Sequence, residues 1–158
     1  MIRTHAPDGY VCPFCGLAAG DTSDPGNRCA VSDVVYQDAD LLVMMGIDTT
    51  GHHPGHVMVC PAEHHENLYS LPDRTLQRIA LACRQVARAM VAVWAPDGVS
   101  LRQRNEPAGH QHGWHYHQHV NPRFEADRYG SAGRRPVPVL ERARLAGELR
   151  AVLDMSHV

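Results

Sequence analysis

The sequence lacks three features that would each assign it to a familiar class of protein. No apolar run approaches the length needed to cross a bilayer, and residues 1–15 carry no apolar segment typical of a secretion signal. Arginine and lysine form no run before the Arg134–Arg135 pair, and the formal net charge is -2, which argues against a surface that tracks nucleic acid. We therefore expect a cytoplasmic protein that binds neither membranes nor nucleic acid, and a small anionic ligand is compatible with this balance.

Low-complexity blocks are also missing. Hydrophobic residues make up 44% of the chain and charged residues 20%, so the chain should fold rather than remain disordered. Its 158 residues correspond to one domain of ordinary size. We expect a single domain over residues 1–158, with a core at about 10–125 and a C-terminal extension at 126–158.

Cysteine is present in an odd number, and this argues against a disulfide framework in a chain with no export signal. Cys12 and Cys15 have a spacing that is typical of a metal knuckle and also of a redox pair. The redox pair is an alternative because this spacing at the start of a helix lowers thiol pKa values. Cys60 lies in an apolar run and Cys83 on an apolar helical face, so both are expected to be small buried residues.

The apolar pattern predicts one long helix and several short strands. Residues 71–94 carry apolar side chains at spacings of three and four, which is typical of a helix with one buried face, and residues 141–153 could form a C-terminal helix. Together with the strands, they predict an α+β fold with a mainly antiparallel, five-stranded sheet, whose first two strands form a hairpin. The predicted strands are residues 34–38, 41–47, 56–60, 99–104 and 114–120.

Histidine is concentrated in residues 110–119, where His115, His117 and His119 occupy alternate positions. In a strand over 114–120 all three would project from one side, whereas a helix would turn His117 away from the other two. The aromatic residues between them favour the strand. A row of imidazoles is costly in a core because each ring needs partners for both nitrogens, so we expect the row to face a cleft or a metal.

Four segments carry a resemblance to a known family. Residues 115–120, HYHQHV, resemble the histidine triad motif, His-φ-His-φ-His-φ-φ, although Gln118 is polar where the family usually has an apolar residue. Residues 53–64, HPGHVMVCPAEH, are similar to the family's Pro-Gly-His segment followed by an apolar strand and Pro-x-x-His. Residues 12–21 resemble its zinc-knuckle start and 121–124 its usual strand ending. The four segments occur in the family's order, and they imply a histidine triad fold of the zinc-knuckle bacterial type.

The resemblance implies three catalytic histidines. His117 would attack the α-phosphorus of a nucleotide and form a nucleotidyl-histidine that water resolves. That chemistry needs a neutral imidazole, so one ring nitrogen should donate to a fixed acceptor, commonly a backbone carbonyl. His119 would contact phosphate oxygens and help to handle the leaving group's proton, and His56 would support that network.

The resemblance also implies a set of binding residues. Asp48 falls where family members bind the ribose hydroxyls, and Gln111 and His112 lie in the loop that binds phosphate. Asn105 is a further nucleotide contact on the same grounds. For Asp48 and Asn105 the alternative is that each is a solvated turn residue and does not contact the nucleotide.

Cys12, Cys15, His64 and His115 match the zinc ligands of the metal-containing members, with His65 as the alternative to His64. Two thiolates and two imidazoles form a closed, structural zinc site. The redox interpretation of the two cysteines ranks below zinc, because His64 and His115 supply two ligands that a redox pair does not require.

The expected function is that of a hydrolase acting on a nucleoside phosphoramidate or a dinucleoside polyphosphate. The resemblance further implies a purine nucleotide or dinucleotide as substrate and a homodimer joined through the long helix and an adjoining strand. Two alternatives stay open: a nucleotidyltransferase or phosphorylase, and a nucleotide-binding module with little activity. Transferases of this superfamily often carry Gln at the third triad position, where this chain has His119, and Gln118 would point to the other face of the strand.

Overall fold

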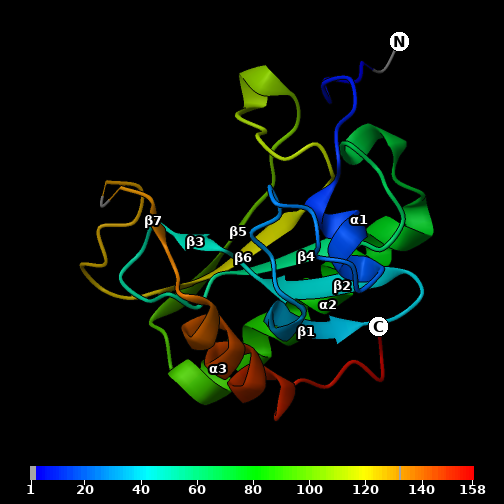
Figure 1. The fold of residues 1–158 in the computed structure, drawn as a ribbon. Helices are drawn as coiled ribbons and strands as arrows, with labels where there is room; N and C mark the ends of the chain where they lie inside the picture. The colour runs from blue at the N-terminus through cyan, green and yellow to red at the C-terminus, as the bar shows by residue number, and fades with distance from the viewer. Residues whose placement is uncertain (1–2, 132) are drawn as a thin grey trace.

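The computed structural model describes residues 3–131 and 133–158, and its centre is an antiparallel sheet of five strands (Figure 1). Their order is β1-β2-β4-β6-β5, and every neighbouring pair runs antiparallel. The α+β fold and the five-stranded sheet are therefore as the sequence predicts. The strands are β1 (Val34–Gln37), β2 (Leu41–Met45), β4 (Val57–Pro61), β5 (Gly98–Arg102) and β6 (Gln118–Arg123).

Strands β2 and β4 are buried on both faces, which explains their unbroken apolar sequences. Leu41, Val43 and Met45 pack on one face of β2 in the core cluster that includes α2 (Asp73–Trp94). Leu42 and Met44 face the other way. Because successive residues of a strand point to opposite faces, a continuous apolar run supplies two separate layers of core.

Three helices cover the sheet. Helix α2 lies on one face, and its apolar side chains at spacings of three and four bury that face; it ends at Ala95, whose φ of 44° is left-handed. The short helix α1 (Pro13–Ala18) lies on the opposite face, where Phe14 packs with Met44 (Figure 1). In the described residues no helix is long and apolar enough to span a bilayer.

The C-terminal segment belongs to the main core. Helix α3 (Val139–Arg150) contributes Leu145 and Leu149 to the cluster that α2 forms with the sheet. Its Arg142 is buried and donates to both carboxylate oxygens of Asp33, at 2.8 and 3.0 Å. This packing supports the proposal that the chain forms one domain.

The observed fold differs from the sequence-based prediction in the position of one strand, and it contains elements that were not predicted. The predicted strand 114–120 is displaced to β6, so that only His119 of the triad lies within a strand. The amide of Tyr116 donates to the carbonyl of His65 instead of joining the ladder, which keeps the residues before Gln118 out of the sheet. Helix α1 was not predicted, nor was the small pair β3 (Asp48–Thr49) with β7 (Arg135–Pro136). The other bounds shift by one to three residues.

Candidate functional site

A cavity of about 1000 Å³ opens beside β6, between α1 and the C-terminal segment. The catalytic histidines predicted from the sequence all line it: His56 at the start of β4, His117 just before β6, and His119 within β6. The structure therefore brings together residues that are up to 63 positions apart. Other lining residues come from the loop after α1, from β3, from the end of β5 and from the segment between β6 and β7: Asn27, Asp48, Arg102, Arg104, Tyr129 and Arg134.

His117 is held as a neutral ring with a defined tautomer. Its Nδ1 lies 2.8 Å from the carbonyl oxygen of His115, and because a carbonyl only accepts, Nδ1 carries the proton. Nε2 is therefore left with a free lone pair. Burial lowers the pKa of His117, against the hydrogen bond to His115, which acts to raise it. Phe14 stacks on the ring with centroids 5.4 Å apart and fixes its plane.

His56 and His119 form a second fixed pair. Nδ1 of His56 donates to the carbonyl of Asp48 at 3.0 Å, so its Nε2 accepts from Nδ1 of His119 at 2.6 Å. Nε2 of His119 is then unprotonated as well. Burial lowers the pKa of His56 to about 4 and that of His119 to about 2. The ring centroids of His117 and His119 lie 4.7 Å apart, edge to face. The cavity therefore holds two neighbouring imidazoles, each with an unprotonated nitrogen.

A glycine makes room for this pair. A Cβ atom at Gly46, directly after β2, would overlap the imidazole of His56, with Nδ1 as its nearest neighbour. Backbone position 46 also donates to the carbonyl of His56 at 2.7 Å. The close approach of these two segments therefore requires glycine at position 46.

A Cys/His centre lies beside the cavity. The ligand atoms of Cys12, Cys15, His64 and His115 are all within 4.8 Å of one another. Sγ of Cys12 is 3.3 Å from Nδ1 of His115, and Sγ of Cys15 is 3.4 Å from Nδ1 of His64. A tetrahedral zinc with bonds of about 2.3 Å to sulfur and about 2.1 Å to nitrogen would separate its ligands by roughly 3.4–3.8 Å. The donor set therefore fits zinc, and the sulfur–nitrogen contacts lie close to these separations.

His115 presents the nitrogen that such a metal requires. Its Nε2 is 3.0 Å from the carbonyl of Pro61, so the proton resides there and Nδ1 is free to face the sulfur atoms. The ring is completely buried. His65, the alternative to His64, lies outside the cluster, with its Nε2 3.7 Å from a carboxylate oxygen of Glu63.

The redox interpretation of the two cysteines loses support. The two imidazoles that complete the cluster have no function in a redox pair but are required in a four-ligand site.

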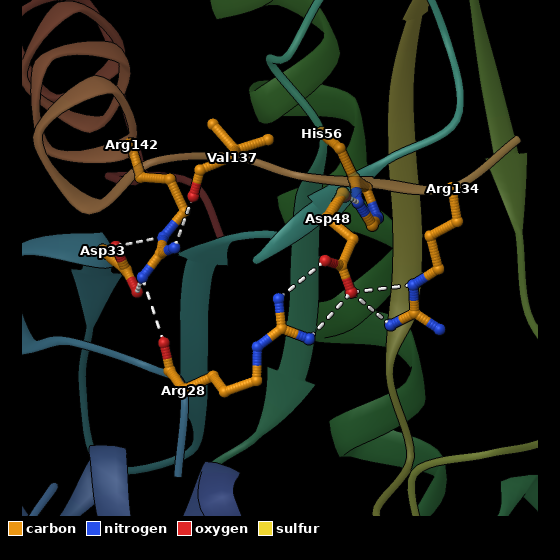
Figure 2. A network of polar contacts seen from close by, with 7 residues as sticks. All are labelled: Arg28, Asp33, Asp48, His56, Arg134, Val137 and Arg142. Atoms are coloured by element: carbon orange, nitrogen blue, oxygen red, sulfur yellow. Dashed lines mark hydrogen bonds and ion pairs between the residues drawn. The ribbon is translucent and has the colours of Figure 1, made fainter. Parts of the chain in front are cut away.

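Asp48 lines the cavity and is bound by two arginines (Figure 2). Arg28 donates from Nη2 to Oδ1 at 2.8 Å and from Nη1 to Oδ2 at 3.3 Å. Arg134 donates from Nε to Oδ2 at 2.7 Å, and its Nη2 is 2.5 Å from the same oxygen. Burial acts to raise the pKa of Asp48, but the bonds from Arg28 and Arg134 outweigh it, so its pKa lies below the ordinary value.

The remaining sequence-predicted binding residues divide into two groups. Gln111 and His112 line the cavity, although the Gln111 amide is used within the fold: Nε2 donates to the carbonyls of Glu66 and Gly113. Asn105 does not line the cavity. Its Oδ1 accepts from the amide of Leu68 and its Nδ2 donates to Gln103, an arrangement typical of a residue that supports a loop.

Sequence reasoning missed two arginines of the cavity. Arg102 and Arg104 both line it, and their charges help to lower the pKa of His119, after burial and the neighbouring histidines. Arg102 is opposite His119 in the β5–β6 register. Their position could have been predicted: both lie at alternate positions at the end of the predicted strand 99–104, and alternate residues of a strand lie on the same face.

Comparison with known proteins identifies similar chains. The protein-family model described as the HIT domain matches residues 27–126 of this chain. The "Protein hit" of Bacillus subtilis (strain 168) is 31% identical over 121 residues, covering 76% of this chain and 77% of that protein. A solved HIT-like protein involved in cell-cycle regulation from Bartonella henselae is 30% identical with a TM-score of 0.69, covering 77% of this chain and 86% of that one. A zinc-bound histidine triad family protein from Mycobacterium smegmatis is 28% identical with a TM-score of 0.73, covering 90% and 92%.

Proposed function

This chain belongs to the HIT domain family, and from that premise we propose that it is a nucleotide hydrolase with His117 as its nucleophile. The observation that carries the proposal is the hydrogen bond from Nδ1 of His117 to the carbonyl of His115. It leaves Nε2 of a neutral ring unprotonated on the wall of the cavity. The proposed substrate is a purine nucleotide with a phosphoanhydride or phosphoramidate bond at its α-phosphorus.

In the first step Nε2 of His117 attacks the α-phosphorus, and the bond from phosphorus to the leaving group breaks. The leaving group keeps the electron pair of that bond and takes up one proton. His119 is the candidate carrier of this proton: a phosphate bound against its Nε2 would raise its pKa from the low value that burial imposes. Arg102 and Arg104 would stabilise the charge on the phosphoryl oxygens.

In the second step water attacks the same phosphorus, and the bond to Nε2 of His117 breaks. The bond's electron pair returns to Nε2, and the proton of the water leaves toward the His119–His56 pair. The products are a nucleoside monophosphate and the protonated leaving group. Splitting the displacement in two lets one fixed imidazole act in both halves.

We propose further that Cys12, Cys15, His64 and His115 hold one structural zinc ion per chain. The fit of the donor set supports this, as does the zinc-bound relative from Mycobacterium smegmatis. When bound, zinc would tie the N-terminal helix α1 to the segment that leads into β6. A homodimer through α2 stays a prediction, which sedimentation analysis of the purified protein would test.

Replacement of the nucleophile tests the proposed chemistry. The His117→Asn variant should lose at least about a thousandfold in kcat on adenosine phosphoramidates and dinucleotides, because no other group can form the covalent intermediate. Its affinity for a nucleoside monophosphate should change little. His157→Asn, an exposed histidine near the C-terminus, is the matched control.

Equal turnover by His117→Asn and the wild type would end the proposal and leave a binding module. Mass analysis of the products with and without added phosphate separates the hydrolase from a phosphorylase. A nucleoside diphosphate formed only when phosphate is present would identify the phosphorylase.

A further inference from the structure

Asn121 is a buried polar side chain on the wall of the cavity. It lies in β6, two residues after His119, and lines the cavity although only 6% of it is exposed. Its Nδ2 is buried and finds no acceptor among the described residues. A buried amide without a partner costs free energy, so such a group in a cavity wall points to a ligand that completes its hydrogen bonds.

The position of Asn121 relative to the histidines follows from strand geometry. His117, directly before β6, alternates with His119 and Asn121, and all three side chains line the cavity, so they share one face. Consecutive members of this row are separated by roughly 6.5 Å along the backbone. Asn121 therefore lies one step beyond His119 and two steps beyond His117.

The ring of Tyr129 lies over the same part of the sheet. Cζ of Arg102 is 4.9 Å from the ring centroid, and Cζ of Arg123 is 4.1 Å from it. Arg102 is opposite His119 in the β5–β6 register. Arg123 lies two residues after Asn121 in β6. Tyr129 thus contacts arginines on either side of Asn121 along the strands, which places its ring over that level of the sheet.

The carboxylate of Asp127 holds Tyr129 in this position. It accepts from the amide of Tyr129 at 2.9 Å, and from Nε and Nη2 of Arg123 at 2.7 and 2.9 Å. Ala126 and Arg128, on either side of Asp127, have left-handed φ angles of 59° and 51°. This conformation costs free energy in residues other than glycine, and the bonds to Asp127 offset that cost. The ring of Tyr129 is therefore a fixed part of the cavity wall.

Arg102 supplies a second set of donors on this wall. Its guanidinium group contacts the ring of Tyr129, but it forms no hydrogen bond or ion pair with any residue that the structure describes. Asp21 and Asp24 also line the cavity, but their carboxylates accept from amides of their own loop and do not pair with Arg102. Arg102 and Asn121 therefore both keep N–H donors for a bound molecule.

The leaving group of the proposed reaction would reach this part of the cavity. In an in-line displacement it departs from the side of the phosphorus that is opposite Nε2 of His117. It takes up its proton from His119, so it lies next to that ring. Asn121 follows His119 on the same face of β6, and Arg102 is opposite His119 on β5.

We propose that Asn121 and Arg102 bind an oxyanion on the leaving group, either a carboxylate or a phosphate, in a subsite walled by Tyr129. This subsite rests on the proposed function, because the nucleophile defines the side on which the leaving group departs. Rotation about the Cβ–Cγ bond turns the NH2 group of Asn121 toward a bound oxygen. The planar guanidinium of Arg102 donates to carboxylate or phosphate oxygens in charge-assisted bonds.

A series of adenosine 5′-phosphoramidates that differ only in the leaving amine tests this subsite on the full chain. The amines are glycine, aminomethylphosphonate and ethylamine, so the group beyond the methylene is a carboxylate, a phosphonate or a methyl. We expect kcat/KM for at least one of the two anionic compounds to exceed that for the ethylamine compound by about tenfold or more. The two anionic arms identify which oxyanion fits. Equal or lower values for both overturn the proposal.

Substitutions at and beside Asn121 locate the preference. Asn121→Leu keeps the approximate size of the side chain but removes its donors, and should reduce the preference by about fivefold or more. Asn121→Ser, which retains a hydroxyl donor, should keep part of it. Ser100→Ala is the matched control, because Ser100 is opposite Asn121 in the strand pair and does not line the cavity. A full preference in Asn121→Leu, or an equal loss in Ser100→Ala, overturns the assignment.

The outcomes also separate this subsite from the reaction as a whole. The basicity of each amine is the same for every variant, so a change in preference between variants reports the subsite alone. If the ethylamine compound is hydrolysed and neither anionic compound is preferred, the subsite fails while the proposed hydrolase stands. If no compound of this series or of the matching guanosine series is hydrolysed, both fail.

Discussion

His115 and His117 are two residues apart, and their rings are held in opposite tautomers. His115 donates from Nε2 to the carbonyl of Pro61 and turns Nδ1 toward two sulfur atoms. His117 donates from Nδ1 to the carbonyl of His115 and leaves Nε2 for the cavity. The same side chain therefore becomes a metal ligand or a nucleophile according to which nitrogen a backbone carbonyl occupies.

The surroundings of the two rings also suit these two roles, one ring as a metal ligand and the other as a nucleophile. The Cys/His centre is closed, since all four of its positions belong to protein ligands and His115 is completely buried. The cavity is open and is lined by both arginine and aspartate side chains beside the histidines. A closed centre should therefore govern stability, and the open one turnover.

Removal of the closed centre should have the largest effect. In Cys12→Ser/Cys15→Ser we expect loss of zinc and a fall in Tm of at least about 10 °C, because structural zinc contributes directly to folding free energy. Metal analysis and thermal unfolding measure both quantities, and a chelator should reproduce the shift in the wild type. Cys83→Ala, a buried cysteine outside the cluster, is the control. An unchanged Tm in the double variant would show that the centre is not structural.

The reverse experiment perturbs the open site alone. Gly46→Ala places a methyl group against the ring of His56, so the His56–His119 bond should break and kcat should fall by roughly 10- to 100-fold. Zinc content should stay at the wild-type level. Gly98→Ala is the matched control, because a Cβ at Gly98 meets no atom within 4 Å. Loss of zinc in Gly46→Ala would contradict the separation of the two regions.

Acid should destabilise the fold, because His56 is buried as a neutral ring. The pKa of His56 falls from 6.5 to about 4 on folding, so the unfolded chain binds the proton more readily between these values. Stability is therefore complete above about pH 6.5 and decreases as the pH falls toward 4. At pH 5 the loss from this group should be about 1–2 kcal/mol. Urea unfolding at pH 7.5 and pH 5 measures it, and His56→Asn should show a smaller difference than the wild type.

The smallest effect is expected on the far side of the strand. The carboxamide of Gln118 accepts from the hydroxyl of Tyr116 at 3.2 Å and does not line the cavity. Gln118→Leu should therefore change kcat less than about twofold and stability by about 1 kcal/mol or less, the ordinary value of one hydrogen bond. Steady-state kinetics would check this, and a tenfold loss would show that both faces serve the reaction.

The sequence predicted the sheet well because its strands carry strong local signals. Residues 41–45 and 57–61 are apolar runs bounded by turns, and both became central strands within two residues of the prediction. The family resemblance and the Cys/His cluster were likewise readable, since both depend on short motifs in a fixed order.

What the sequence could not provide was the pairing of distant backbone groups. The start of β6 moved to Gln118 because the amide of Tyr116 is taken by His65, 51 positions away. The pair β3–β7 depends on contacts between segments with little strand character of their own. The two arginines on Asp48 depend on the same long-range closure: the charge of the C-terminal segment pointed Arg134 toward the site, but the linear pattern does not show that Arg28 shares its carboxylate.

The buried guanidinium of Arg142 also has a consequence for the order of folding. Besides Asp33, it binds the carbonyls of Val137 and Arg28, and so joins α3 to the loop that carries the Arg28 side chain (Figure 2). The neighbouring residue Asn27 lines the cavity. The wall of the cavity can therefore be completed only once α3 has docked on the main core.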